Sequence, residues 1–202
     1  MPRPPKITNE EILAAAREVF LEQGIGASTL DIAERAGISE ASIFKRFNTK
    51  QALFLAAIGI TEKPEWVNRL ANETPTANFK AELTDICTQM LAFYQEVLLR
   101  VFLLMSQGNF PRRPQVPPPP VRDSQLLAKF LDRAIERGLI RSCNTMALAH
   151  AIAGAMANYI LTKKLASQRS ADWPVSDITV LDSETFVRGL IEALWAGMAP
   201  ES

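Results

Sequence analysis

The sequence predicts an all-α fold of nine to ten helices, with three short helices at the N-terminus and a larger helical part after them. Apolar residues recur at the 3.6-residue spacing of helices along most of the 202 residues. Serine, threonine, asparagine or aspartate residues stand where these periodic segments begin, as helix caps do. Residues 178–181 are the only short run rich in β-branched side chains, so no sheet is expected.

The first helix is predicted from about Asn9 to Gln23. Thr8 and Glu11 have the spacing of a capping box, in which each side chain binds the backbone N–H of the other residue. Gly24 then ends the helix, because glycine accepts backbone conformations that other residues avoid. The apolar stripe of this helix is expected to consist of Ile12, Ala16, Val19 and Phe20.

The next two predicted helices are short and closely spaced. Ser28 or Thr29 caps the first of them, and Gly37 ends it in the left-handed conformation. Ser39 caps the second. Ala33 is small enough for the second helix to cross closely over the first. These features predict a helix-turn-helix, whose second helix enters the major groove of DNA.

A fourth helix is expected to begin at a cap formed by Asn48 and Gln51 and to end or kink at Pro64. From about residue 76 to 107 the chain reads as helical and strongly apolar. This segment is long for one helix of a compact domain, so we expect a break near residues 94–96.

The second half of the chain is also predicted to be helical. Six prolines between residues 110 and 121 indicate an irregular surface connector, and a ligand for a proline-binding module is the alternative. Helices are expected at about 122–137 and at 144–166, the latter rich in alanine. The last helix, at 183–197, begins at a cap formed by Asp182.

The composition is that of an ordinary globular chain, with 22 basic and 22 acidic residues and no net charge. DNA-binding proteins are often basic, and here residues 41–53 hold three basic residues and no acid. No apolar run reaches the ~18 residues of a membrane span, and no secretory signal is visible, so we expect a cytoplasmic protein without a membrane partner.

Cysteine and histidine are scarce. Cys87, Cys143 and His150 lack the spacing of a metal site, so neither a metal nor another cofactor is expected. Two buried, inert thiols are the expected state of the cysteines, and a redox-sensing pair is the alternative.

Several short motifs in the first quarter of the chain follow one another at the spacing of a known family. They are Phe20-x-x-x-Gly24, Ser28-Thr29, Ile32-Ala33, Ala36-Gly37-Ile38-Ser39, Ser42-Ile43-Phe44, Phe47 and Lys50. Together they resemble the N-terminal domain of the tetracycline-repressor (TetR) family of bacterial one-component regulators. The resemblance covers roughly residues 7 to 55. It implies an all-helical homodimer with a helix-turn-helix DNA-binding domain, residues 1–52, and a larger effector-binding and dimerisation domain, residues 53–202.

The resemblance also implies which side chains contact DNA. Thr29 and Lys50 stand at positions that bind the DNA backbone. Phe44 stands at a position where the family most often has tyrosine. Lys45 or Arg46 suits a guanine edge, with a solvated charged face as the alternative. The exposed face of the recognition helix is expected to comprise Ser39, Glu40, Ala41, Ser42, Lys45 and Arg46; Ala41 suits a thymine methyl group, and Glu40 either a cytosine amino group or solvent.

The later helices carry more aromatic and methionine residues than one small core obviously needs, and the resemblance implies a ligand cavity among them. For the lone histidine, a satisfied core position is the alternative. No charge cluster indicates an anionic ligand, so a small, largely apolar effector is expected. The candidate effector-binding residues are Trp66, Gln89, Phe93, Tyr94, Phe102, Met105, His150 and Asn158.

These features predict a sequence-specific DNA-binding transcriptional regulator, a repressor that its effector releases from a pseudo-palindromic operator in double-stranded DNA. The helices at 144–166 and 183–197 are expected to form the homodimer interface. An enzyme is disfavoured, because the chain lacks a phosphate-binding loop and the spacings of a catalytic triad or metal site. The remaining alternative is a helix-turn-helix binding protein without a regulatory small-molecule ligand.

Overall fold

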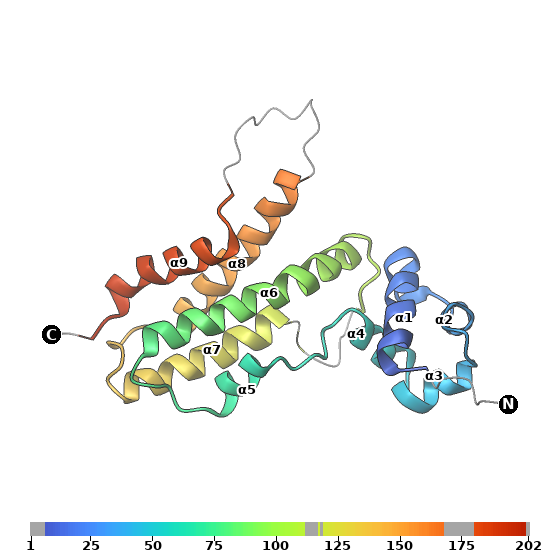
Figure 1. Ribbon diagram of the computed structural model, residues 1–202, viewed down its shortest axis with the longest axis horizontal. Helices are drawn as coiled ribbons and strands as arrows, with labels where there is room; N and C mark the ends of the chain where they lie inside the picture. Colours follow the sequence, from blue (N-terminus) through green and yellow to red (C-terminus); the bar gives the residue numbers. More distant parts are fainter. Residues whose placement is uncertain (1–6, 112–116, 118, 168–179, 201–202) are drawn as a thin grey trace. The chain divides into compact units, whose positions relative to one another are not determined.

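The computed structural model describes residues 7–111, 117, 119–167 and 180–200 (Figure 1). These residues form nine α-helices and one short 3-10 helix, with no strand among them, which confirms the all-α prediction. The helices are α1 (Asn9–Gln23), α2 (Thr29–Ala36), α3 (Glu40–Phe47), α4 (Lys50–Ala57), α5 (Glu65–Asn72), α6 (Phe79–Ser106), α7 (Pro119–Glu136), α8 (Thr145–Ser167) and α9 (Ser183–Met198), and the 3-10 helix is η1 (Gly24–Gly26).

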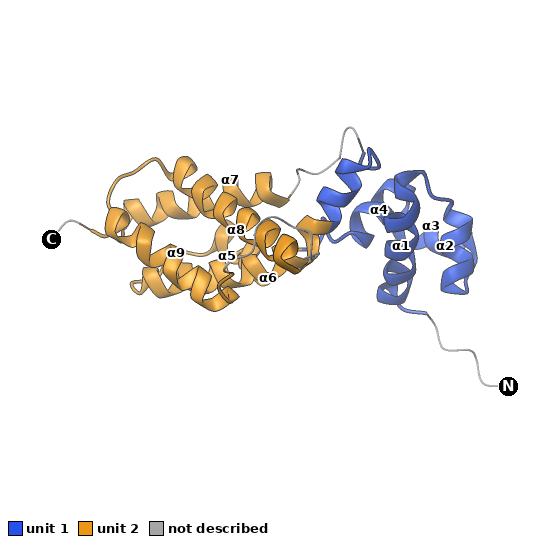
Figure 2. Cartoon of the chain, turned by 90° about the horizontal axis from the view of Figure 1, so that it is seen from above, with its two compact units in different colours: residues 1–62, 100–116 blue, residues 63–99, 117–202 orange. Residues whose placement is uncertain are grey.

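The chain divides into two compact units, shown in different colours in Figure 2. The first comprises residues 1–62 and 100–116, and the second comprises residues 63–99 and 117–202. This division keeps α4 whole, whereas the domain boundary expected between residues 52 and 53 falls inside that helix. It also divides α6, whose last residues pack with the N-terminal helices.

In the first unit, α1 packs against α2 and α4, and α2 packs against α3. The ring of Phe20 in α1 meets the ring of Phe54 in α4 edge-on, with centroids 5.0 Å apart. Arg17 Nε donates a hydrogen bond to the backbone carbonyl of Ala57 at 2.7 Å, which ties α1 to the end of α4. The core of this unit includes Ile12, Ala16, Val19, Phe20, Ile32, Ala33, Ile43, Leu53 and Phe54, all buried.

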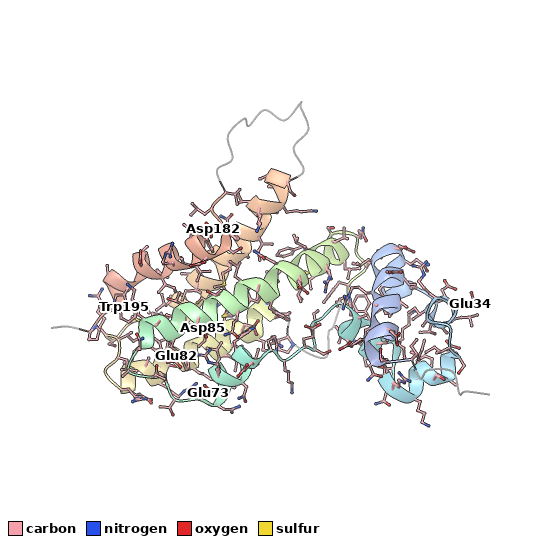
Figure 3. The ribbon with its side chains drawn as sticks, viewed as in Figure 1. Glu34, Glu73, Glu82, Asp85, Asp182 and Trp195 are labelled. Carbon is pink, nitrogen blue, oxygen red and sulfur yellow. The ribbon has the colours of Figure 1, made fainter. Side chains whose placement is uncertain are left out.

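In the second unit, α7 packs against α5 and α8. Arg69 in α5 forms an ion pair with Asp85 of α6, Nη1 to Oδ2 at 2.5 Å, and lies 3.7 Å from Glu82 of the same helix; Figure 3 labels both acids. Arg69 lowers the pKa of Asp85 by a side-chain hydrogen bond. Buried aliphatic and aromatic side chains from α5 to α9 form a single core beneath this surface network.

Several sequence-based expectations about helix boundaries are wrong. Helix α6 is continuous through residues 94–96, because it contains neither proline nor glycine to break it. The cap of α4 is Thr49, whose side chain accepts a hydrogen bond from the N–H of Ala52, while Asn48 adopts a positive φ of 58°. Pro64 caps the start of α5 instead of ending the preceding helix.

The proline-rich segment is only partly a connector. Residues 112–116 and 118 lie outside the described residues, but Pro119 and Pro120 form the first turn of α7. Proline is tolerated there because the first backbone N–H groups of a helix have no intrahelical acceptor. Between α8 and α9, residues 168–179 also lie outside the described residues.

Helix α6 is the one described helix that is long and apolar enough to span a membrane by length and composition. Half of its most apolar window is buried inside the structure. Such burial is what the central helix of a helical core requires, and α6 contributes Leu83, Ile86, Met90 and Leu98 to that core.

Candidate functional site

The tight turn between α2 and α3 has the geometry that the sequence predicts for a helix-turn-helix. Gly37 has φ 66° in the left-handed region, and its N–H donates to carbonyls in the last turn of α2. The N–H of Ile38 donates to Ala33 O at 3.0 Å, which completes the end of the helix. Ser39 then caps α3, since its side chain accepts from the N–H of Ser42.

Helix α3 has one buried and one exposed side. Ile43 is fully buried against the first unit's core, whereas Ala41 and Lys45 are exposed. Phe44 and Ser42 are half-buried at the edge of this exposed side. We call the side formed by Ala41, Ser42, Phe44 and Lys45 the outer face of α3. It is free of acidic side chains, which suits a surface that approaches DNA phosphates.

Two of the predicted DNA-contacting residues bind one another. The hydroxyl of Thr29, at the start of α2, donates to the carboxylate Oε1 of Glu40, at the start of α3. Thr29 is buried, so its hydroxyl faces the α2–α3 contact. This pair holds the first turns of the two helices together, and it gives Glu40 a partner inside the protein.

Arg46 also has partners inside the protein. Its Nη1 donates to the backbone carbonyl of Ile7 at 2.9 Å and to Oδ1 of Asn9 at 3.1 Å. Sequence reasoning placed Arg46 on the DNA-facing side, but its guanidinium reaches the N-terminal end of α1. The spacing of α3 residues alone does not reveal this contact, because the acceptors lie 37 and 39 residues earlier in the chain, at and just before the start of α1.

The remaining predicted DNA contacts flank the outer face. Ser39 Oγ lies 2.9 Å from Ser42 Oγ, so the two hydroxyls share a hydrogen bond. Lys50 is the first residue of α4 and is half-buried. Leu30, the second residue of α2, has 53% of its surface exposed. It is a large apolar side chain of the helix-turn-helix that does not pack into the core.

Two acidic residues of α1 form ion pairs with an arginine of α2. Arg35 of α2 pairs with Glu18 and Glu22 of α1, each at 3.4 Å. These are exposed pairs, which contribute at most about 1 kcal/mol to stability. They give two of the four acidic residues of α1 a basic partner within the first unit.

Three of the eight predicted effector-binding residues lie together in the second unit. The rings of Trp66 and Phe93 meet at 5.9 Å, and those of Phe93 and Tyr94 lie 6.2 Å apart. Trp66 and Tyr94 are fully buried and Phe93 is half-buried. The indole Nε1 of Trp66 is buried without a hydrogen-bond partner among the described residues. Buried donors are nearly always satisfied in native proteins, which makes this N–H unusual.

A buried acid completes this cluster, which we call the Tyr94 cluster: Trp66, Phe93, Tyr94, Arg122 and Asp123. The hydroxyl of Tyr94 donates to Asp123 Oδ2 at 3.1 Å, and Arg122 Nε donates to Asp123 Oδ1 at 2.6 Å. Burial raises the pKa of Asp123, although Arg122 and Tyr94 act in the opposite direction. Burial raises the pKa of Tyr94, and the negative charge of Asp123 raises it further.

Sequence reasoning missed Asp123 and Arg122. A signal for the acid was available, because Asp123 shares a helix face with Leu127, Phe130 and Leu131, all of which are buried. An acid in register with an apolar stripe indicates a buried carboxylate that needs partners.

The other five predicted effector residues are not in this cluster. Gln89 donates to Asp85 at 3.0 Å on the surface of α6. His150 and Asn158 are exposed on α8, so the histidine is neither a core residue nor part of the Tyr94 cluster. Phe102 and Met105 belong to the first unit and are 45% and 55% exposed.

The second unit also has a surface cavity that the sequence did not indicate. It has a volume of about 250 Å³. Its walls are Gln95 and Leu99 of α6 together with Ile160, Lys163, Lys164 and Ser167 of α8. Gln95 donates to Ser183 Oγ at 3.0 Å, which joins α6 to the start of α9 beside it.

The cysteines and acids form no metal centre within the described ranges. Cys87 is fully buried, and burial raises the pKa of its thiol to about 12. A thiol with such a pKa stays protonated at neutral pH and is a poor nucleophile. Cys143 is half-buried.

The family model of the bacterial regulatory proteins of the tetR family matches residues 12–57, from the first turn of α1 to the end of α4. YvkB of Bacillus subtilis (strain 168), an uncharacterized HTH-type transcriptional regulator, is 26% identical over 189 residues, which are 91% of this chain and 97% of YvkB. BepR of Brucella suis biovar 1 (strain 1330), an HTH-type transcriptional repressor, is 42% identical over 59 residues, 29% of this chain and 28% of BepR.

Similarity of fold extends over the whole chain. The solved structure of FrrA, described as a flavonoid-responsive regulator, matches with a TM-score of 0.63 and 22% identity. The match covers 96% of this chain and 97% of FrrA. The curated relatives named above are transcriptional regulators, not enzymes, in agreement with the sequence-based prediction.

Proposed function

We propose that this chain, a DNA-binding transcriptional regulator of the TetR family, acts in the cytoplasm as a dimeric repressor that a small, largely apolar effector releases from its operator. The observation that carries this proposal is the helix-turn-helix with its outer face of α3. That face carries the exposed residues Ala41 and Lys45 and no acidic side chain, and Ile43 and the Thr29–Glu40 contact support it from behind. It has the size and chemistry of a recognition surface for the major groove.

Repression is proposed because BepR, which is 42% identical over 59 residues of the DNA-binding part, is described as a repressor. A repressor needs only to occupy its operator. One helix-turn-helix reads a short half-site, so two copies bound to a pseudo-palindrome give the affinity that occupation requires.

The dimer interface is proposed on α8 and α9. Along α8, exposed small and apolar residues recur at helical spacing, and such a stripe permits close approach of a second helix. Along α9, Gly189, Ala193 and Ala196 are exposed in the same manner. A second copy of the chain is the proposed occupant, because two-fold pairing of these helices gives a four-helix interface that suits a two-fold operator. The α8 stripe consists of Ala147, Ala151, Gly154, Asn158, Leu161 and Leu165.

The effector is proposed to bind beside the Tyr94 cluster. Trp66 and Phe93 supply aromatic surface, and the Trp66 N–H supplies a donor that lacks an acceptor. An aromatic compound with a carbonyl or ether oxygen fits these groups, and the description of FrrA as flavonoid-responsive supplies a precedent for that chemistry.

The DNA-binding proposal is tested by operator selection from genomic fragments, followed by footprinting. We expect protection of a pseudo-palindrome with half-sites about one helical turn apart. Lys50→Ala should weaken binding to all sequences alike and lower the salt slope by about one unit per protomer. Lys163→Ala, on α8, is the matched control and should change neither. Failure to select any sequence would leave a helix-turn-helix interaction protein as the function.

The effector proposal is tested with flavone as the probe. Flavone should quench Trp66 fluorescence and weaken operator binding, and operator DNA must weaken flavone binding by the same factor. Trp66→Phe should remove the quenching, while Trp195→Phe, in the same unit, should leave it. Binding of flavone without any change in operator affinity would show that it is not an effector.

A further inference from the structure

Arg46 makes a contact that its position in the sequence does not predict. It lies in the last turn of α3, and its Nη1 donates to the carbonyl of Ile7 and to the side-chain carbonyl of Asn9, at 2.9 and 3.1 Å. These acceptors precede it by 39 and 37 residues. Hydrogen bonds from a charged donor are stronger than neutral ones, and the bond to the Ile7 carbonyl is partly shielded from water, whereas the bond to Asn9 is exposed.

The acceptors belong to a part of the chain that is held in place independently. Thr8 and Glu11 form a complete capping box at the start of α1. Helix α1 then packs against α2 and α4 through Phe20 and its neighbours. Arg46 therefore connects the C-terminal turn of α3 to a fixed point on α1, while the Thr29–Glu40 contact holds the other end of α3.

We propose that Arg46 is a positioning residue that sets the orientation of α3 through Ile7 and Asn9, and that Lys45 is the cation of α3 that contacts DNA. This inference rests on the proposed DNA interface. Lys45 is exposed on the outer face, whereas turning the Arg46 guanidinium toward a base would break both bonds to α1. Arg46 thus acts on recognition through the helix that carries the reading side chains.

The test compares Arg46→Ala, Asn9→Ala, the double variant and Lys45→Ala on a selected operator and its single-base variants. Arg46→Ala should weaken binding about tenfold on every one of these sequences, the effect of losing hydrogen bonds to a charged group. Asn9→Ala should cause a smaller loss of affinity. In the double variant, the loss should be less than the sum of the losses in the two single variants. Alanine favours helix more than asparagine does, so helix propensity does not explain a loss at residue 9.

The salt dependence separates positioning from direct contact. Arg46→Ala and Asn9→Ala should leave the salt slope unchanged, because neither removes a phosphate contact. Lys45→Ala should lower the slope by about one unit per protomer or abolish discrimination at one base pair. The inference is overturned if Arg46→Ala abolishes discrimination at a single base pair, lowers the salt slope, or is fully additive with Asn9→Ala.

If the wild-type chain selects no operator, the proposed function is refuted. The positioning role of Arg46 can still be tested by a measurement that needs no DNA. Amide hydrogen exchange of residues 44–48 should accelerate in both Arg46→Ala and Asn9→Ala and stay at the wild-type rate in Lys45→Ala. Unchanged exchange in the first two, with a wild-type circular dichroism spectrum, would overturn the positioning role.

Discussion

At the scale of single residues, the second unit buries the carboxyl group of Asp123 fully inside an apolar core. Two partners, Arg122 and Tyr94, bind its two oxygens. A buried charge is tolerated when its hydrogen bonds are satisfied, and removing one partner costs more than the net contribution of the bond. The Tyr94 hydroxyl is therefore more important for stability than an ordinary tyrosine hydroxyl.

Tyr94→Phe should lower the free energy of unfolding by about 1–3 kcal/mol, because a buried carboxylate oxygen loses its donor. Urea denaturation measures this loss. Tyr159→Phe is the matched control: the Tyr159 hydroxyl donates to the carbonyl of Leu181 at 2.9 Å in a partly exposed place. Its removal should cost only about 0.5–1.5 kcal/mol. A smaller loss for Tyr94→Phe than for the control would contradict the importance of the buried pair.

The stability of the second unit should depend on pH through Asp123. Its pKa in the folded protein is raised above the ordinary 3.8, so folding favours the protonated form. The stabilisation that comes from protonated Asp123 is complete below the ordinary pKa, and it is lost as the pH rises through the pKa of Asp123 in the folded protein. The free energy of unfolding of the wild type, relative to Asp123→Asn, should therefore decrease from about pH 4 upward. Urea midpoints of both proteins at several pH values measure it, and an increase with pH would refute the raised pKa.

At the scale of elements, the residues that follow α6 contact η1 and α4 within the first unit. The N–H of Ile25 donates to Asn109 O at 3.3 Å, and the ring of Phe110 lies 6.1 Å from that of Phe54. Gly24 makes this approach possible, because a Cβ at residue 24 would collide with the Asn109 side chain. Helix α6 therefore belongs to both units. Its residues up to Leu99 lie in the unit that is proposed to bind the effector, and its residues from Arg100 lie in the unit with the helix-turn-helix.

Gly24→Ala should destabilise the first unit by about 1–3 kcal/mol. Residue 24 has φ 70° and ψ −166°, a conformation that is essentially restricted to glycine, and the added methyl group also displaces Asn109. Gly26→Ala is the control, since nothing lies within 4 Å of a Cβ there. Thermal unfolding of the two variants compares them, and equal melting temperatures would show that Asn109 and the backbone at residue 24 readily adjust.

At the scale of the whole molecule, the proposed function requires two copies of the chain. The second unit buries one side of α8, including Ala149, Ile152 and Met156, in its own core. The opposite side of α8 exposes the stripe described above, with Leu161 at 49% exposure. Apolar surface of this kind is stabilised by burial at about 25 cal/mol per Å², which favours association.

Leu161→Glu should produce a monomer, because a charge would then be buried unpaired at the centre of the proposed interface. Sedimentation velocity measures the change, and operator affinity should fall with it, since a monomer reads only one half-site. Lys163→Glu, two residues along the same helix, changes a charge on a different side of α8 and should remain dimeric. An intact dimer for Leu161→Glu would place the interface on another surface.

The sequence by itself determined the elements whose hydrogen bonds close locally. Thr8, Ser28, Ser39 and Asp182 cap helices as predicted, and Gly37 adopts the left-handed conformation. Each of these interactions joins residues no more than four positions apart, so spacing and residue type are sufficient to predict it. The helix-turn-helix, the all-α class and the family resemblance all follow from such local patterns.

Only the tertiary structure decided which side chains meet across helices. Arg46 binds Ile7 and Asn9, Thr29 binds Glu40, and Tyr94 binds Asp123 at a separation of 29 residues. Spacing within one helix predicts the side on which a residue lies, but the partner on that side depends on how the helices pack. The residues of the proposed DNA interface were therefore predicted as a face, whereas the partners of Thr29 and Arg46, like the buried acid beside Tyr94, depend on contacts that long-range packing creates.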